Sequence, residues 1–384
     1  MYRTVSCLLL LCCLSSAAIS GSSDGCVVLR YQHIDDATPG GISVTPEQFQ
    51  QHVDYLFKND YHVLHLEDVV TSLRTGVDLP QRCVALTIDG AFQSAYEEAF
   101  PRVTRYEFPL TVFISSAAVD ARLDGQLSWQ QMREMQAGGV SFQSLGHSHK
   151  HLVRRETDET LEDWQQRIAF DIQLAQSRIE DELGLRPTLF AYPFGEYNEE
   201  LQQMIASMGL TGFGMQAGAL WQQADFTALP RFALASFGAR LRPFSRKIEA
   251  QPLPIAGAFP LDPVVPLDEW KPALTLVFKP GEIEHRRLRC LLNGSPGMVY
   301  QWLEQPENAV MVSPRGRLRV GRNRVDCTLQ LGEDGSTGWY SHLWIRRNAD
   351  GDWYRESIDP LRVIPPTRKA PESRADSQDE PGTR

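Results

Sequence analysis

The sequence predicts an α/β protein, an irregular (β/α)7-type barrel followed by a small antiparallel β-sandwich. Two patterns carry this prediction. Between residues 27 and 231, short apolar runs alternate with amphipathic helical stretches in about seven units, which is typical of a parallel sheet curled into a barrel or a distorted relative of one. Beyond residue 273, apolar and polar residues alternate in short runs separated by turns such as Asn293-Gly294 and Asp350-Gly351, which favours a sandwich.

The barrel strands are expected at the apolar runs, and the helices at segments with start and stop signals. Thr45 before Pro46 marks the start of one helix, and Ser128 and Gly138 bracket another. The expected strands are residues 27–31, 62–66, 84–88, 110–114, 140–144, 189–192 and 211–215, and the expected helices are residues 45–59, 66–75, 94–106, 128–137, 158–183 and 198–208. Sandwich strands are expected at residues 274–278, 288–292, 298–302, 309–312, 324–330, 341–345 and 353–356.

Composition changes along the chain divide it into five parts. Residues 1–20 contain Arg3, an apolar stretch and a run of small residues, which is the pattern of a secretory signal peptide. We therefore expect a periplasmic or secreted protein. The barrel is expected at residues 26–250, a proline-rich linker at 251–272, the sandwich at 273–363 and a polar, disordered tail at 364–384.

Charge and cysteine usage narrow the class of protein. The net charge is −10 and no basic stretch could follow a phosphate backbone, so nucleic acid is excluded as a partner; no apolar run is long enough to span a membrane. Four cysteines remain after the signal segment and allow three pairings. Cys26 and Cys83 each precede a predicted strand, and Cys290 and Cys327 both lie in the C-terminal part. Two intra-domain disulfides are favoured, and free buried thiols are the alternative.

Polar residues follow several of the predicted barrel strands. Asp89 ends the strand at residues 84–88, and the alternative reading of this residue is a turn or a helix cap. In a barrel of parallel strands, catalytic groups lie at the carboxyl ends of the strands. Other polar groups at such ends are His33, the serines after residue 114, the three histidines His147, His149 and His151, and Arg231.

Seven segments in a fixed order resemble one known family. They are YQHI, LTIDGAF, TVFIS, LSWQQMREM, SLGHSHKHL, FAYPFGEYN and LPRF, between residues 31 and 232. The chain thereby resembles the polysaccharide deacetylases (carbohydrate esterase family 4, the NodB-homology domain). The resemblance implies an irregular barrel that hydrolyses acetamide C–N bonds of an N-acetylated polysaccharide with a zinc-type divalent metal. The C-terminal part resembles an accessory carbohydrate-binding module.

The resemblance assigns roles to individual residues. Asp89 takes the place of the general base and His149 that of a metal ligand, while the other two ligand positions fall on Gly90 and Leu145, which have no ligand atoms. The backbone N–H of Phe194 takes the place of the oxyanion donor. Arg231 could hold Asp89 ionised or form an ordinary salt bridge. With two of three ligands missing, metal-dependent catalysis is expected to be impaired, and whether the protein is an enzyme stays open.

Two alternatives remain from the sequence. If the loop slides by two residues, His147 and His151 become the ligand pair of an active deacetylase. Otherwise the chain is a non-enzymatic scaffold or glycan-binding component of an exopolysaccharide or biofilm system. His33, Trp129 and Tyr192 are the candidates for substrate binding, although a buried core position is the ordinary role of an aromatic side chain.

Overall fold

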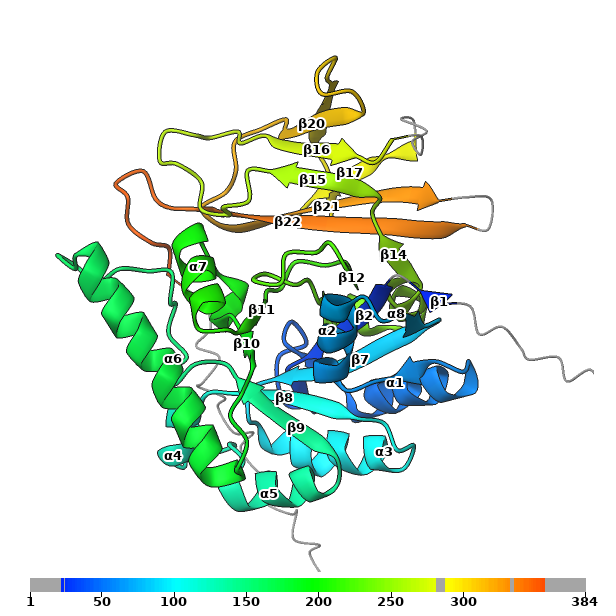
Figure 1. Cartoon of the computed structure of the whole chain (residues 1–384), viewed down its shortest axis with the longest axis vertical. Coiled ribbons are helices and arrows are strands. Elements are labelled where there is room, and N and C mark those ends of the chain that lie inside the picture. Colours follow the sequence, from blue (N-terminus) through cyan, green and yellow to red (C-terminus); the bar gives the residue numbers. More distant parts are fainter. Residues whose placement is uncertain (1–21, 24, 281–286, 332–334, 356–384) are drawn as a thin grey trace, which may run out of the picture.

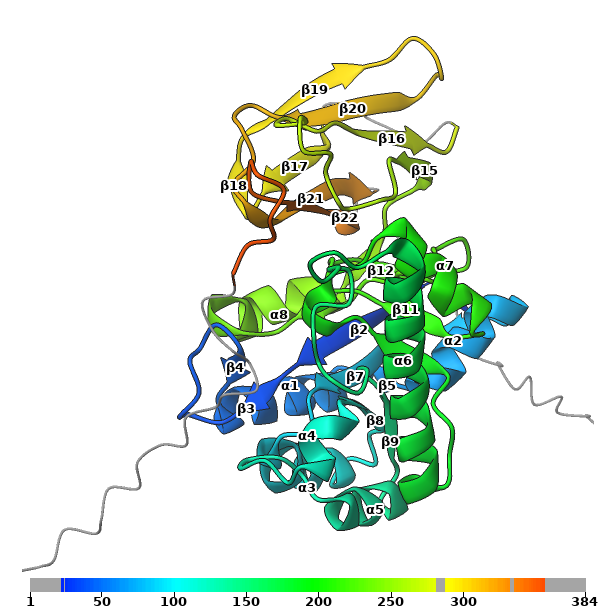
Figure 2. The same ribbon diagram turned by 90° about the vertical axis from the view of Figure 1, so that its left-hand side faces the viewer.

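The computed structural model describes residues 22–23, 25–280, 287–331 and 335–355, and shows a curled half-barrel with two antiparallel sheets stacked on one side of it (Figures 1 and 2). The fold class expected from the sequence is therefore confirmed. The expected signal peptide and C-terminal tail lie outside the described residues. No helix within the described ranges has the length and apolar character needed to cross a bilayer.

The half-barrel is a nine-stranded sheet whose main path runs β11–β10–β9–β8–β7–β2–β12. All seven expected strands are present, and only the added edge strand β12 runs antiparallel to its neighbour. The strands are β2 (Gly25–Tyr31), β5 (His62–Val63), β7 (Cys83–Asp89), β8 (Leu110–Ile114), β9 (Val140–Ser144), β10 (Leu189–Ala191), β11 (Thr211–Phe213), β12 (Ala219–Trp221) and β13 (Phe232–Ala233). Two short ladders flank it, β1 (Ser22–Ser23) with β6 (Leu79–Pro80) and β3 (His33–Ile34) with β4 (Ser43–Val44).

Most of the expected helices are present near their predicted bounds, but α6 begins at Leu161 instead of residue 158, and α4 and α8 were not expected. Thr45 and Ser128 each form a capping box, and Gly184 ends the longest helix in a left-handed conformation. The helices are α1 (Pro46–Lys58), α2 (Leu66–Thr75), α3 (Phe100–Thr104), α4 (Ser116–Asp120), α5 (Trp129–Ala137), α6 (Leu161–Leu183), α7 (Glu199–Ser207) and α8 (Leu241–Ile248). The helix expected at residues 94–106 starts instead as a π-helical turn, η1 (Ala95–Ala99), and two further short 3-10 turns are η2 (Pro193–Gly195) and η3 (Ser236–Ala239).

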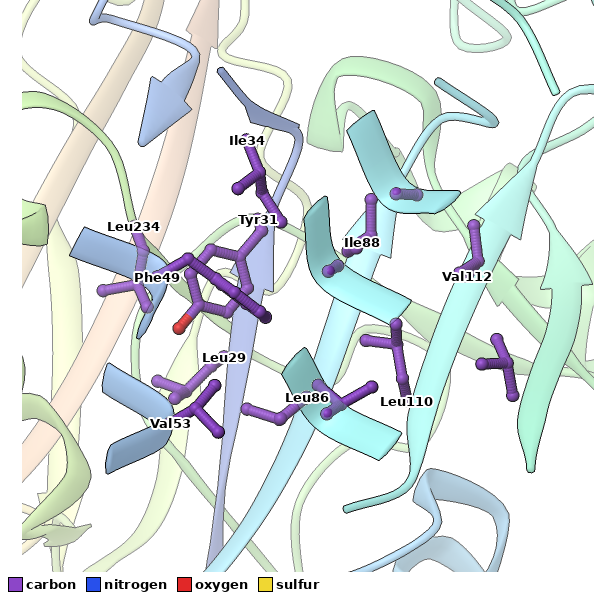
Figure 3. Packing of buried hydrophobic residues seen from close by; sticks show 14 of the residues in the cluster. Leu29, Tyr31, Ile34, Phe49, Val53, Leu86, Ile88, Leu110, Val112 and Leu234 are labelled. Carbon is purple, nitrogen blue, oxygen red and sulfur yellow. The ribbon is translucent and has the colours of Figure 1, made fainter. Parts of the chain in front are cut away.

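The main hydrophobic core fills the space between the sheet and its helices. Alternate residues of the central strands point to one face, where Leu29 and Tyr31 of β2 meet Phe49 and Val53 of α1 (Figure 3). The remaining residues of the same strands, such as Val28, form a second core with α2 on the other face. Because both faces are covered, the strands read as nearly continuous apolar runs, and their ends are fixed in place.

The C-terminal sheets pack face to face. One has the order β14–β22–β21–β17–β18 and the other β15–β16–β20–β19. Their strands are β14 (Ala250–Pro252), β15 (Ile255–Phe259), β16 (Leu274–Phe278), β17 (Arg289–Leu292), β18 (Ser295–Pro296), β19 (Met298–Trp302), β20 (Ala309–Pro314), β21 (Gly321–Leu331) and β22 (Ser336–Arg346). The proline-rich segment thus supplies strands to both sheets. The strand expected at residues 353–356 is absent from the described residues 353–355.

Two disulfides link neighbouring strands, with the pairing that the sequence favoured. Cys26 of β2 bonds to Cys83 of β7, because the parallel register that pairs Val27 with Val84 brings the preceding residues together. Cys290 of β17 bonds to its direct partner in β21, Cys327. Each part of the molecule therefore contains one covalent cross-link between strands.

Candidate active site

The polar residues expected at the strand ends gather at one edge of the half-barrel. Asp89 is the last residue of β7, Ser115 follows β8, and the histidine loop, residues 145–151, follows β9. Phe194 lies in η2, directly after β10. The neighbouring positions of these strands in the sheet bring the segments together, as a parallel sheet requires.

Asp89 is held by two arginines. Arg231 donates from both terminal nitrogens to the two carboxylate oxygens, at 2.6 and 2.9 Å, and Arg30 of β2 donates from Nε at 2.5 Å. Arg231 is completely buried and Asp89 is 5% exposed. Burial alone would raise the pKa of Asp89, but the two guanidinium groups outweigh burial and hold the pKa below its ordinary value. Asp89 is therefore a carboxylate at neutral pH, and both of its oxygens accept hydrogen bonds.

The position after Asp89 has no room for a side chain. Gly90 has a φ of +99°, and a Cβ there would lie 2.2 Å from the ring of Phe92. That ring in turn packs on His33, with 3.8 Å between the ring centroids. Burial lowers the pKa of His33 to about 4, so this imidazole is neutral at neutral pH. The phenyl ring of Phe92 thus fills the space into which a residue at position 90 would extend.

The three histidines of the loop contact three different groups. Nδ1 of His147 lies 2.8 Å from the hydroxyl of Ser116, Nδ1 of His149 lies 3.0 Å from the hydroxyl of Ser115, and Nδ1 of His151 lies 2.8 Å from a carboxylate oxygen of Glu196. His147 thus points toward α4, whereas His151 points toward β10 and stacks on Phe194. These directions do not bring His147 and His151 together as a ligand pair beside Asp89.

Leu145 belongs to the apolar interior. It is 2% exposed and packs in the core that contains Phe113 and Phe213, while its backbone N–H donates to Ile114. The loop after it is shaped by Asp171 of α6, whose carboxylate accepts from the backbone N–H groups of His147 and Ser148. No pattern in the sequence points to Asp171, because a single aspartate in a helix reads as an ordinary surface carboxylate.

The residues at this edge do not fit a divalent metal. A zinc-type ion needs three protein ligands, and the positions to which the resemblance assigns them carry Gly90, the buried Leu145 and His149. The nearby carboxylate of Asp89 is occupied by two arginines. In the part of the chain that the structure describes, no three histidine, cysteine, aspartate or glutamate side chains converge in the manner of a metal site.

Phe194 has an uncommon backbone conformation. Its φ of 61° is in the left-handed region, which a phenylalanine rarely adopts unless the surroundings hold it there. Glu196, two residues on, is completely buried and accepts from His151, Arg154, Arg322 and Tyr354. The last two residues come from the C-terminal part of the chain. The sequence did not single out this cluster, because its members are far apart in the chain.

Two of the expected substrate-binding residues face away from the strand ends. Trp129, at the start of α5, donates its indole N–H to Asp120 and lies against Arg178. Tyr192 is 1% exposed and donates its hydroxyl to the backbone carbonyl of Thr227. The structure therefore places both in contacts that hold the fold, whereas His33 packs on the ring of Phe92, in the turn after Asp89.

Comparisons with known proteins agree with this fold. Residues 76–213 match the family model Polysaccharide deacetylase. The poly-beta-1,6-N-acetyl-D-glucosamine N-deacetylase of Escherichia coli (strain K12) is 22% identical over 260 residues, which is 59% of this chain and 38% of that protein. The enzyme of the same name from Staphylococcus epidermidis is 25% identical over 199 residues, 50% of this chain and 68% of the relative.

Two solved structures share the half-barrel. The Streptococcus pyogenes deacetylase PplD in complex with acetate superimposes with a TM-score of 0.53 at 21% identity, over 59% of this chain and 99% of the other. IcaB from Ammonifex degensii gives a TM-score of 0.52 at 20% identity, over 59% of this chain and 98% of the other. The half-barrel thus has the fold of these solved structures, and residues 76–213 match the polysaccharide deacetylase family. It spans 38% of the length of the Escherichia coli relative.

Proposed function

We propose that this chain is an exported member of the polysaccharide deacetylase family that recognises an N-acetylated glycan but does not catalyse metal-dependent deacetylation. The observation that carries the proposal is that position 90 has neither a metal-ligating side chain nor the space for one. Gly90 offers no ligand atom, and Phe92 occupies the space beside it. An ion at this edge would retain His149 as its one family ligand, which is too few to hold it.

Asp89 supports the recognition part of the proposal. A general base must be able to take up a proton near the working pH. The pKa of Asp89 is instead held low by Arg231 and Arg30, and both of its oxygens are engaged. The group therefore shapes a fixed polar edge, with Arg30, His149 and Phe194 around it, on which the hydroxyl and acetamide groups of a sugar could form hydrogen bonds.

The choice of glycan and compartment rests on the relatives and the disulfides. Several curated relatives are named poly-beta-1,6-N-acetyl-D-glucosamine N-deacetylases, so an N-acetylated polysaccharide is the ligand we propose. Two disulfides are typical of oxidising compartments, in keeping with an exported protein.

The test measures acetate release, bound metal and glycan binding on the same protein. Purified full-length chain is incubated with an N-acetylglucosamine oligomer in the presence of zinc, cobalt or nickel, with Asp89→Asn as the control. We expect acetate release no greater than that of the control, metal well below one ion per chain, and measurable glycan binding by calorimetry. Stoichiometric metal that is lost in His149→Ala, together with acetate release that depends on Asp89, would show an active deacetylase instead.

A further inference from the structure

A cavity lies where the half-barrel meets the C-terminal sheets. Its volume is about 300 Å³, and it is lined by segments around β12 on the barrel side and by β15 and β22 on the other side. None of the residues that hold Asp89 lines it. We call it the junction cavity. Its size is at the lower end of the range of small-molecule sites, about 300–1,000 Å³, and domain junctions are a frequent place for such sites.

Aromatic rings form much of its wall. Tyr197 and Trp221 come from the barrel side, and Phe259, Trp339 and Tyr340 from the sheets. Phe259 lines the cavity and is 57% exposed, so its ring is also open to solvent. Flat aromatic faces suit a ligand that has one apolar ring face and a polar periphery.

Several polar groups of the lining have hydrogen-bonding capacity to spare. The hydroxyls of Tyr197 and Tyr340 form no hydrogen bond to any residue that the structure describes, and burial raises the pKa of both phenols. Oε1 of Gln216 and Nε2 of His342 are fully buried and also have no partner among the described residues. Buried polar atoms are costly when left unpaired, so this lining favours a ligand rich in hydroxyl or amide groups.

The cavity carries little net charge. Asp225 is the one carboxylate in its lining, and its two oxygens already accept from Gln202 and Thr227. His342 is neutral, because burial lowers its pKa to about 4. Among the described residues, no arginine or lysine is part of the lining, although Nζ of Lys279 lies 4.6 Å from the ring of Trp221. The lining itself therefore offers little counter-charge to a phosphorylated ligand or a metal ion, whereas a neutral molecule would lose little on entry.

We propose that the junction cavity is a binding site for one neutral pyranose residue of a glycan, separate from the Asp89 edge. Stacking on the aromatic walls would hold the apolar face of the ring, and Tyr197 and Tyr340 would hydrogen-bond its hydroxyl groups. Because the walls come from both parts of the chain, an occupied cavity would also join them. The choice of an N-acetylated sugar as the probe rests on the function proposed above.

The experiment titrates N-acetylglucosamine and its tetramer into the full-length chain by calorimetry. Tyr340→Phe removes only a hydroxyl from the cavity, and Ala256→Trp places a large ring at its lining from an exposed position, so neither should disturb folding. Tyr96→Phe is the matched control, since its hydroxyl bonds to Glu134 on the far side of the barrel. His149→Ala reports on the Asp89 edge in parallel.

Tyr340→Phe should weaken tetramer binding by about 2- to 12-fold, the effect of one lost hydrogen bond, and Ala256→Trp should weaken it further, while Tyr96→Phe leaves it unchanged. Binding that is insensitive to both cavity variants but weakened by His149→Ala would overturn this proposal and leave the proposed function standing. Sensitivity to the cavity variants alone would support the junction cavity and remove glycan recognition from the Asp89 edge. If neither sugar binds, both proposals fail.

Discussion

The buried charge of Arg231 is compensated by the carboxylate of Asp89. The guanidinium is fully buried and donates two hydrogen bonds to Asp89. Replacing Arg231 with methionine would leave Asp89 with Arg30 as its one cation, so we expect a loss of about 3–5 kcal/mol in the free energy of unfolding. Arg178→Met is the control, because its ion pairs with Asp120, Glu182 and Asp181 are partly exposed and each should contribute less than about 1 kcal/mol. Urea denaturation measures both, and similar losses would contradict the argument.

A pair of glycines separates backbone strain from steric conflict. Gly90 and Gly139 have similar positive φ values of +99° and +91°, but an added Cβ meets the Phe92 ring at Gly90 and open space at Gly139. Gly139→Ala should therefore lower the free energy of unfolding by about 1–3 kcal/mol, because of the backbone conformation alone. Gly90→Ala should lower it by about 1–3 kcal/mol more, because the added methyl group overpacks against Phe92.

Thermal unfolding of Gly90→Ala, Gly139→Ala and the double variant Gly90→Ala/Phe92→Ala decides this point. Part of the extra loss at position 90 should return in the double variant, relative to Phe92→Ala alone, because the ring that the new methyl group meets has been removed. Equal losses at the two glycines would show that Phe92 moves aside freely, and the space beside Asp89 would then be open to a side chain.

The sequence identified Asp89, Gly90 and Leu145 as the unusual positions, since each can be read from a motif. It could not reveal Arg30 or Phe92 as their neighbours. Arg30 lies on β2, and its contact with Asp89 depends on β2 and β7 being adjacent in parallel register. Phe92 reads as one more apolar residue, and only the fold of the turn after β7 brings its ring against His33. Contacts between segments distant in the chain carry no local pattern.

At the level of elements, the long apolar runs and the capped helices were predictable, and the short strands were not. β8 and β9 have the expected bounds, because all five residues of β8 and four of the five residues of β9 are buried. β13 and β14 have two and three residues, and their pairing partners are β2 and β22, far away in the sequence. Such short strands form because a neighbouring strand offers free backbone hydrogen-bonding groups, so the local sequence shows no clear strand pattern.

The two disulfides each tie one pair of strands, and their removal should destabilise the part that contains them. Replacing Cys26 and Cys83 together with alanine should lower the free energy of unfolding by about 2–4 kcal/mol. Replacing Cys290 and Cys327 should lower it by slightly less, because the loop that this disulfide closes is shorter. Calorimetry of both double variants, with the oxidised parent as reference, measures the two losses. A variant as stable as the parent would mean that its disulfide does not stabilise the protein by restricting the unfolded chain.

For the whole molecule, the contact between the two parts has an apolar and a polar component. Trp339 of β22 packs edge-on against Phe232 of β13, with 5.0 Å between the ring centroids. Beside the Asp89 edge, Arg322 of β21 donates to Glu196 at 3.1 Å, and the hydroxyl of Tyr354 donates to the same carboxylate. The C-terminal sheets therefore help to fix the loop that follows β10, and with it Phe194.

Arg322→Met should weaken the contact between the two parts of the chain. Arg324→Met is the control on the same strand, because Arg324 pairs with Asp326 within its own sheet.

Burial would raise the pKa of Glu196, but His151, Arg154 and Arg322 lower it to about 2. A carboxyl group with a depressed pKa contributes stability above its unfolded pKa of about 4.3, and this contribution is lost as the pH falls toward 2. Scanning calorimetry should show that Arg322→Met lowers the melting temperature or separates two transitions at pH 7, and that its difference from the parent shrinks between pH 4 and pH 2. A difference independent of pH, or one matched by Arg324→Met, would mean that Glu196 does not couple the two parts.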